Sequence, residues 1–213
     1  MTPRGLLLAA ALPLSLSRLA LAVAPGYVEL NFEVDTTTNS GSSGSAASTT
    51  GGPTFISGVS VNGKTKNVLK LDGIDDNIYF DSGAATQTFT IAFWMSRQTT
   101  NGGNRNYIVE GRTGGGGNFY WLLDDNPLAI AIMERYDSPG VMTLDVWEHW
   151  AYTQTAGVSG ILYRNGAVFQ TYPVNPGVHD TVGGTMIIGS HTSCKLLRVG
   201  PAGCILPACA AFL

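Results

Sequence analysis

The segment Thr88-Phe89-Thr90-Ile91-Ala92-Phe93-Trp94-Met95 decides the fold of this chain. Its odd-numbered positions carry large apolar side chains, and its even-numbered positions carry two threonines, an alanine and a tryptophan. A hydrophobic period of two places the apolar set on one face of a β-strand, whereas a helix would repeat every three to four residues. The segment therefore predicts a strand whose inward face contributes Phe89, Ile91 and Phe93 to a core.

Similar short apolar runs, separated by turn residues, extend along the chain in both directions. Val28–Val34 alternates apolar and polar positions and predicts a half-buried strand. Asn165-Gly166 lies between two apolar runs, which favours a type I′ β-hairpin. Many short strands without an amphipathic helix predict an all-β fold, an antiparallel β-sandwich of the jelly-roll type. We expect Trp150 and Tyr152 in its core as well.

The composition agrees with a single turn-rich β-domain and excludes several classes of protein. Among the 213 residues, 27 are Gly and 13% are charged, and the formal net charge is −3. This length suffices for one all-β domain with a sizeable core, and the low charge content argues against a coiled coil or charged disorder. No cluster of Lys and Arg offers the basic surface that a phosphate backbone requires, so we expect no nucleic-acid partner.

Residues 1–24 have the pattern of a secretory signal peptide. Arg4 supplies a positive charge, Leu6–Leu16 are largely apolar, and Ala20-Leu21-Ala22 offers a cleavage site with small residues. Arg18 interrupts the apolar stretch, which is then too short for a membrane-spanning helix. We therefore expect a secreted, extracellular protein with no membrane span after cleavage. The alternative is an N-terminal anchor that stays attached.

Four motifs, in order along the chain, carry a resemblance to a known family. They are Leu69-Lys70-Leu71-Asp72-Gly73-Ile74-Asp75-Asp76-Asn77, the segment 88–95, Trp147-Glu148-His149-Trp150-Ala151-Tyr152-Thr153 and Leu162-Tyr163-Arg164-Asn165-Gly166. Together they resemble the laminin-G-like jelly-roll domains of the concanavalin A-like lectin/glucanase superfamily, which are related to the pentraxins. The resemblance covers residues 27–190. It implies a non-catalytic module that binds a glycan or an extracellular protein.

The resemblance to lectins directs attention to one stretch with the residue types of a sugar site. Asn118 and Tyr120 follow a run of glycines, and Asp124 and Asp125 lie in the next turn. An aromatic ring can stack on a sugar, and amides and carboxylates can bond its hydroxyls. Phe119 and Trp121 share a strand face that belongs to the core in this interpretation, which leaves Tyr120 as the outward aromatic. We expect the ligand-binding residues here.

The family resemblance also implies a calcium ion, because related domains often hold one in the loop after the first strand. The nearest match to that loop's D-x-S-G element is Asn39-Ser40-Gly41, where an amide replaces the acid, and Asp35 is the nearby carboxylate. The loop after Ile187-Ile188-Gly189 carries no acid, which argues against a pentraxin-like pair of calcium ions. The expectation is at most one weakly bound calcium ion, at Asp35 and Asn39.

Asp72, Asp75 and Asp76 form a second acidic group. It can be interpreted as a cation site or as a solvated turn in which aspartate side chains bond nearby backbone N–H groups. The solvated turn is the preferred interpretation.

An enzyme is the alternative function. Glucan hydrolases of related folds carry E-x-D-x-E on a strand, and Glu29-Leu30-Asn31-Phe32-Glu33 has this spacing with an amide in place of the middle acid. His149 lacks an accompanying nucleophile motif, so we interpret it as a structural histidine bonded to backbone. Catalysis is not expected, and glycoside hydrolysis stays open as the alternative.

Residues 191–213 depart from the family pattern. They contain all three cysteines and two prolines, Pro201 and Pro207, and they lack the family's last strand, which resembles F-x-G-x-I-D-E-V. The sequence therefore predicts a divergent apolar tail, a sandwich without its closing strand, and an unpaired edge beside Val28–Val34. Leu196–Val199 is the segment that can fill part of the gap. An incomplete, non-functional gene product is the further alternative.

Overall fold

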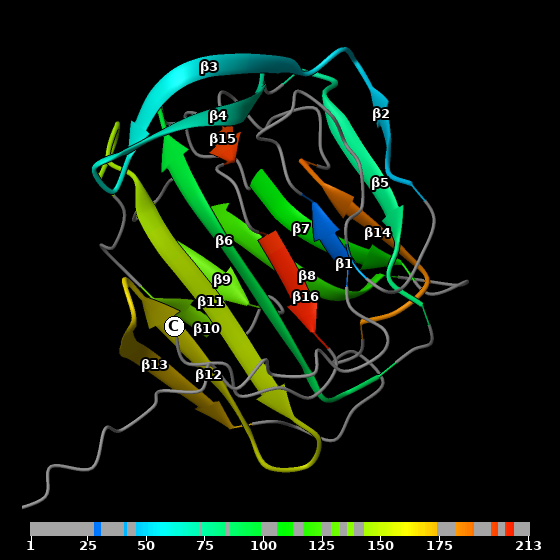
Figure 1. The fold of residues 1–213 in the computed structure, drawn as a ribbon. Coiled ribbons are helices and arrows are strands. Elements are labelled where there is room, and N and C mark those ends of the chain that lie inside the picture. Colours follow the sequence, from blue (N-terminus) through cyan, green and yellow to red (C-terminus); the bar gives the residue numbers. More distant parts are fainter. Residues whose placement is uncertain are drawn as a thin grey trace, which may run out of the picture.

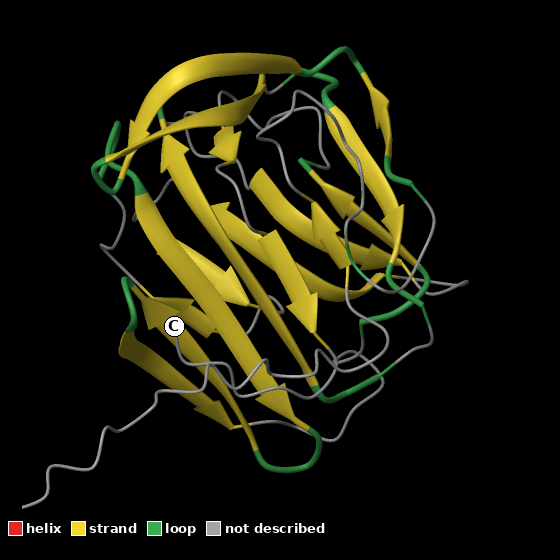
Figure 2. Cartoon of the chain, viewed as in Figure 1, coloured by secondary structure: helices red, strands yellow, loops and turns green. Residues whose placement is uncertain are grey.

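The computed structural model describes residues 28–30, 41, 46–72, 74–83, 86–98, 106–112, 117–124, 129–132, 136–138, 143–173, 182–189, 197–199 and 203–206. All regular elements in these ranges are strands (Figure 2). No helix in the described ranges is long and apolar enough to cross a membrane. The predicted signal peptide, residues 1–24, lies outside these ranges.

Two antiparallel sheets form the domain, one in front of the other in Figure 1. The nine-stranded sheet contains, in order, β13 (Ala167–Pro173), β12 (Ser159–Arg164), β11 (Glu148–Thr155), β6 (Phe89–Arg97), β15 (Leu197–Val199), β4 (Lys64–Leu71) and β3 (Thr54–Val61), with β16 (Gly203–Leu206) beside β6 and β1 (Val28–Leu30) beside β16. The seven-stranded sheet contains β10 (Tyr136–Ser138), β9 (Ala129–Ile132), β8 (Gly117–Asp124), β7 (Asn106–Arg112), β14 (Thr185–Ile188), β5 (Asn77–Asp81) and β2 (Ser48–Thr50).

The core lies between the two sheets and is rich in aromatic rings. On β6, the odd-numbered residues 89–95 are buried and the even-numbered residues 90–94 are half-buried, as the alternation predicts. Phe89 meets Phe119 of β8 with ring centroids 5.2 Å apart, and Phe93 meets Trp121 at 4.7 Å. These contacts join the sheets, because β6 and β8 belong to different ones. The prediction of a sandwich is confirmed.

The predicted hairpin at Asn165-Gly166 joins β12 to β13. Both residues have positive φ, 51° and 81°, as a type I′ turn requires. Asn165 also connects this turn to β11, because its side-chain oxygen accepts the backbone N–H of His149 at 2.9 Å and its own N–H donates to the His149 carbonyl at 2.7 Å.

The C-terminal segment corrects one expectation. The edge beside Val28–Leu30 is not unpaired, because β16 pairs with β1 on one side and with β6 on the other. β15 lies between β6 and β4, in agreement with the expectation that Leu196–Val199 fills part of the gap left by the closing strand. Val199 of β15 pairs with Met95 of β6, and Cys204 of β16 pairs with Ala92 of the same strand. The closing position is thus occupied by two short strands, β15 and β16, both paired with β6.

Candidate functional site

The turn that carries Asp72, Asp75 and Asp76 connects the two sheets. It follows β4 of the nine-stranded sheet and precedes β5 of the seven-stranded sheet. Leu71 before it and Ile78 after it are fully buried, which anchors both ends of the turn in the core. The expected strand–turn–strand element is therefore present, and its strands belong to different sheets.

Hydrogen bonds within the turn bring its acids together. The backbone N–H of Asp72 donates to Oδ2 of Asp76 at 2.7 Å, and the N–H of Ile74 donates to Oδ1 of Asp72 at 2.7 Å. The side-chain amide of Asn77 donates to the Asp75 carbonyl at 2.8 Å. These are the aspartate-to-backbone bonds that the sequence predicts for a turn.

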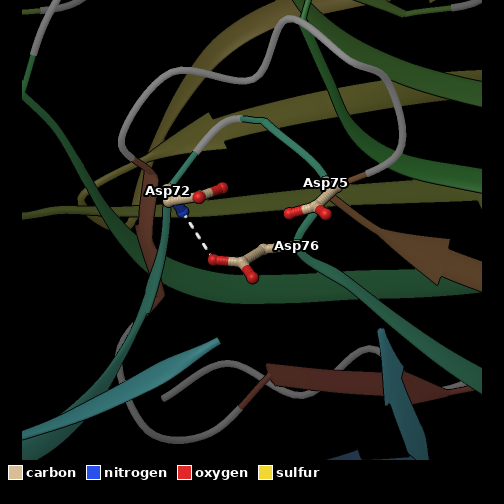
Figure 3. A group of neighbouring side chains, drawn as sticks. All are labelled: Asp72, Asp75 and Asp76. Atoms are coloured by element: carbon tan, nitrogen blue, oxygen red, sulfur yellow. Dashed lines mark hydrogen bonds between the residues drawn. The ribbon is translucent and has the colours of Figure 1, made fainter. Parts of the chain in front are cut away.

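The three carboxylates converge, as Figure 3 shows. Each offers one oxygen, and the three oxygens lie within 4.8 Å of one another. Asp75 is exposed and Asp72 is half-buried, whereas Asp76 is only 4% exposed. Three carboxylates this close could hold a metal ion, since oxygen ligands are those that hard cations prefer.

The environment of Asp76 disfavours its charged form. Burial raises the pKa of Asp76 above its ordinary value, and the negative charges of Asp72 and Asp75 raise it further, while the backbone N–H of Asp72 opposes the shift. Oδ1 of Asp76 is buried and has no hydrogen-bond partner among the described residues. The preferred interpretation of a solvated turn is therefore wrong for Asp76, although the predicted backbone bonds are present.

Two glycines let neighbouring segments approach this turn. A Cβ atom on Gly51 would lie 2.5 Å from the carbonyl carbon of Asp75, and one on Gly189 would lie 2.8 Å from the carbonyl oxygen of Asp76. Both glycines have positive φ, 81° and 82°, a conformation that other residues rarely adopt. Gly51, which lies between β2 and β3, and Gly189, which follows β14, thus pack closely against this turn.

The burial of Asp76 had a signal in the sequence. Ile78 and Phe80 of β5 are buried, and Asp76 has the same parity two residues earlier. Because side chains alternate along a strand, extending the pattern back by one step points Asp76 inward. A charged residue at an inward position is uncommon enough to single it out.

The predicted ligand residues lie on or beside β8. Asn118, Tyr120 and Asp124 belong to this strand, and their side chains lie outside the described part of the structure. Phe119 and Trp121 are fully buried, as expected of the core face. Asp125 lies outside the described residues.

The other predicted positions are placed as follows. Asp35 and Asn39, the expected calcium ligands, lie outside the described residues, as do Asn31 and Glu33 of the hydrolase-like pattern. His149 is half-buried and packs against Trp94, with ring centroids 5.3 Å apart, and burial lowers the pKa of its imidazole. The backbone N–H and the carbonyl of His149 each form a hydrogen bond with Asn165, and the structural role of the imidazole stays a prediction.

Comparison with protein families defines the class of this protein. The model of the concanavalin A-like lectin/glucanase superfamily matches residues 72–196, more than half of the chain. The chain belongs to this superfamily. The resemblance that the four motifs suggested is confirmed. No curated protein sequence is detectably similar to the chain.

Solved structures with the same fold include binding domains of toxins and a domain of a glycosidase. The binding domain of Paraclostridial Mosquitocidal Protein 1 has a TM-score of 0.66 at 16% identity, over 86% of this chain and 49% of that one. The botulinum neurotoxin serotype D ligand binding domain in complex with N-acetylneuraminic acid has a TM-score of 0.63 at 14% identity, over 86% and 48%. This chain spans about half the length of both domains. Domain 4 of AbnA, a GH43 extracellular arabinanase from Geobacillus stearothermophilus, in complex with arabinotriose, has a TM-score of 0.61 at 15% identity, over 84% and 93%.

Proposed function

We propose that this protein is a secreted, non-catalytic module that binds carbohydrate. The observation that carries the proposal is the match to domain 4 of the arabinanase AbnA. It extends over 84% of this chain and 93% of that domain, which is described in complex with arabinotriose. The match therefore compares one whole domain with another. The serotype D domain, of which this chain matches 48%, is also described in complex with a sugar, N-acetylneuraminic acid.

The sugar site that we propose consists of Asn118, Tyr120, Asp124 and Asp125. Buried Phe119 and Trp121 anchor β8 against the opposite sheet, so the strand offers a rigid support for ligand-binding residues. A phenol ring next to amide and carboxylate groups matches the needs of a sugar, which presents apolar C–H faces and polar hydroxyls. An extracellular protein ligand is the alternative within the same class of function.

Three further expectations from the sequence belong to this proposal. Residues 1–24 direct export as a signal peptide, and residues 27–190 form the binding domain, followed by the tail 191–213. Asp35 and Asn39 bind the calcium ion that the family resemblance implies. Export would also agree with a glycan ligand on a cell surface or in the extracellular medium.

Binding to arabinotriose and to N-acetylneuraminic acid tests the proposal. We expect the purified protein to bind at least one sugar of a glycan array, with the affinity then measured by calorimetry. Tyr120→Ala should weaken that affinity by about tenfold or more, as expected for loss of an aromatic ring worth about 1.4 kcal/mol or more. Tyr163→Ala, on the other sheet, is the matched control and should bind as the unaltered protein does.

Two results would contradict the proposal. Absence of binding across the array, together with capture of an extracellular protein, would favour the protein-ligand alternative. Release of reducing ends from a glucan would show the hydrolase alternative.

A further inference from the structure

Two hairpin turns of the nine-stranded sheet contain the same dipeptide, Asn-Gly. Asn62-Gly63 joins β3 to β4, and Asn165-Gly166 joins β12 to β13. Both residues of each turn have positive φ, 48° and 72° in the first turn and 51° and 81° in the second. All of them are exposed, and nothing lies within 4 Å of the Cβ position of either glycine. The two turns therefore share one backbone conformation and the same access to water.

The two asparagines differ in the hydrogen bonds that hold them. The side-chain oxygen of Asn165 accepts the backbone N–H of His149, and the backbone N–H of Asn165 donates to the His149 carbonyl. The side chain of Asn62 forms no hydrogen bond with the residues that the structure describes. Strand order explains the difference, because β12 has β11 beside it, whereas β3 is the last strand of the sheet (Figure 1).

An Asn-Gly pair contains the two groups of a cyclisation reaction, and glycine has no side chain to obstruct it. The backbone nitrogen of the glycine loses its proton to solvent hydroxide, attacks Cγ of the asparagine and forms a new N–Cγ bond. The Cγ–Nδ2 bond breaks, and its electron pair leaves with the nitrogen, which takes a proton from water and departs as ammonia. Water then adds to either carbonyl carbon of the cyclic imide, the ring C–N bond breaks, and the nitrogen regains its proton. The product is aspartate or isoaspartate, with water consumed and ammonia released.

We propose that Asn62 is a site of spontaneous deamidation and that the fold protects Asn165 from the same reaction. The reaction brings Cγ of the asparagine to the nitrogen of the following glycine. The side chain of Asn165 is bonded toward β11, whereas Gly166 leads to β13, on the other side of β12. Its bond to His149 therefore breaks before Cγ can react. Asn62 has no such bond to break, and this inference does not depend on the proposed sugar binding.

Deamidation at Asn62 would change the edge of the nine-stranded sheet. It adds a negative charge next to Lys64, and isoaspartate also adds a methylene group to the backbone of the turn. Because the length of a hairpin loop determines its turn type, isoaspartate should disturb the pairing of Val61 with Lys64. Among the described strands β3 pairs only with β4, so the disturbance should stay within this hairpin.

Peptide mapping by mass spectrometry tests the proposal on the full-length protein, incubated at mildly alkaline pH both in buffer and in concentrated urea. Urea removes the contacts of the fold, so the rate in urea is the reference for each asparagine. We expect Asn62 in the folded protein to deamidate within about threefold of its rate in urea, and Asn165 to be slowed about tenfold or more, because its hydrogen bond must break first. The variants Asn62→Asp and Asn165→Asp provide matched standards for the aspartate products, since aspartate also tolerates positive φ.

The comparison between the two turns decides the outcome. Equal slowing of both asparagines by the fold would overturn the proposal, and so would stronger slowing at Asn62 than at Asn165. A third pair, Asn101-Gly102, lies outside the described residues, and peptide mapping separates its signal from the other two. No sugar is present in these measurements, so failure of the proposed function would leave their result unchanged.

Discussion

Arg164 donates hydrogen bonds from both Nε and Nη2 to a single oxygen of Glu148. Glu148 is only 2% exposed, and the guanidinium carbon of Arg164 lies 5.5 Å from the ring centroid of buried Trp150. The strand register explains the arrangement, because Arg164 is directly opposite Trp150 on the neighbouring strand. The pair thus brings two opposite charges to the inner face of the nine-stranded sheet.

Removing one partner of this pair should destabilise the protein. Arg164→Ala leaves the buried carboxylate of Glu148 without its counter-ion, and we expect a loss of about 2–3 kcal/mol in the free energy of unfolding, since Arg164 is partly exposed. Urea denaturation measures the effect. The double variant Glu148→Met with Arg164→Met should regain much of the stability, because it buries no charge. A double variant less stable than Arg164→Ala would contradict this explanation.

Gly160 is required because of a close contact with the core. A Cβ atom there would lie 2.1 Å from Oη of Tyr152, whose hydroxyl donates to Gln154 at 3.0 Å. We expect Gly160→Ala to lower the free energy of unfolding by about 1–3 kcal/mol through overpacking. Tyr152→Phe, which removes the clashing oxygen, should reduce this penalty in a double-mutant cycle.

Gly63→Ala is the control for that cycle. Gly63 has a positive φ of 72°, and nothing lies within 4 Å of its Cβ position. Its substitution should cost about 1–2 kcal/mol through backbone conformation alone, with no coupling to Tyr152→Phe. Equal coupling at both glycines would refute the steric account of Gly160.

The lowered pKa of His149 predicts a pH dependence of stability. Burial disfavours the charged imidazolium, so the folded protein binds this proton less tightly than the unfolded chain, whose pKa is near 6.5. The contribution of neutral His149 is therefore complete above pH 6.5 and is lost as the pH falls below it. Urea denaturation between about pH 7.5 and pH 5.5 should show a smaller decrease for His149→Gln than for the unaltered protein. An identical decrease in both would show that other groups cause it.

A break in the backbone pairing of β16 should also remove the hydrogen bonds that hold β1 in the sheet. Among the described residues, β1 pairs only with β16, and Ile205 lies opposite both Val28 and Ile91. Ile205→Pro removes a backbone donor from a strand with neighbours on both sides. In hydrogen exchange, amides of Val28–Leu30 and Thr90–Ala92 should lose protection, whereas those of the β12–β13 hairpin should keep it. Unchanged protection at Val28–Leu30 would argue against this pairing.

The core could be predicted from the sequence because alternation along a strand is a local property. Phe89, Ile91, Phe93, Trp150 and Tyr152 are all buried, as expected. The burial of Asp76 was not predicted, since three acids in a turn ordinarily face water, and only the parity with Ile78 indicated otherwise.

The closing strand could not be predicted because strand pairing uses the backbone and needs no family motif. Absence of the motif after residue 190 indicated an open edge, yet β15 and β16 pair there with β6. Neither β15 (Leu197–Val199) nor β16 (Gly203–Leu206) contains a proline, so each strand keeps all its backbone donors. The candidate sugar site rests on residue types alone, and pairing of β8 with β7 and β9 shows only where its backbone lies.

The pairing of β1 with β16 has a consequence for the order of events during synthesis. Val28–Leu30 leave the ribosome long before their partners, Gly203–Leu206, are made. Contacts between residues so distant in sequence close a long loop and form slowly. Until then the edge of β6 is a site where another nascent chain can pair, so aggregation competes with folding at this step. A chaperone that keeps other nascent chains away from the edge of β6 should therefore raise the yield of folded protein. Its effect should exceed that of a chaperone that accelerates the formation of local hairpins.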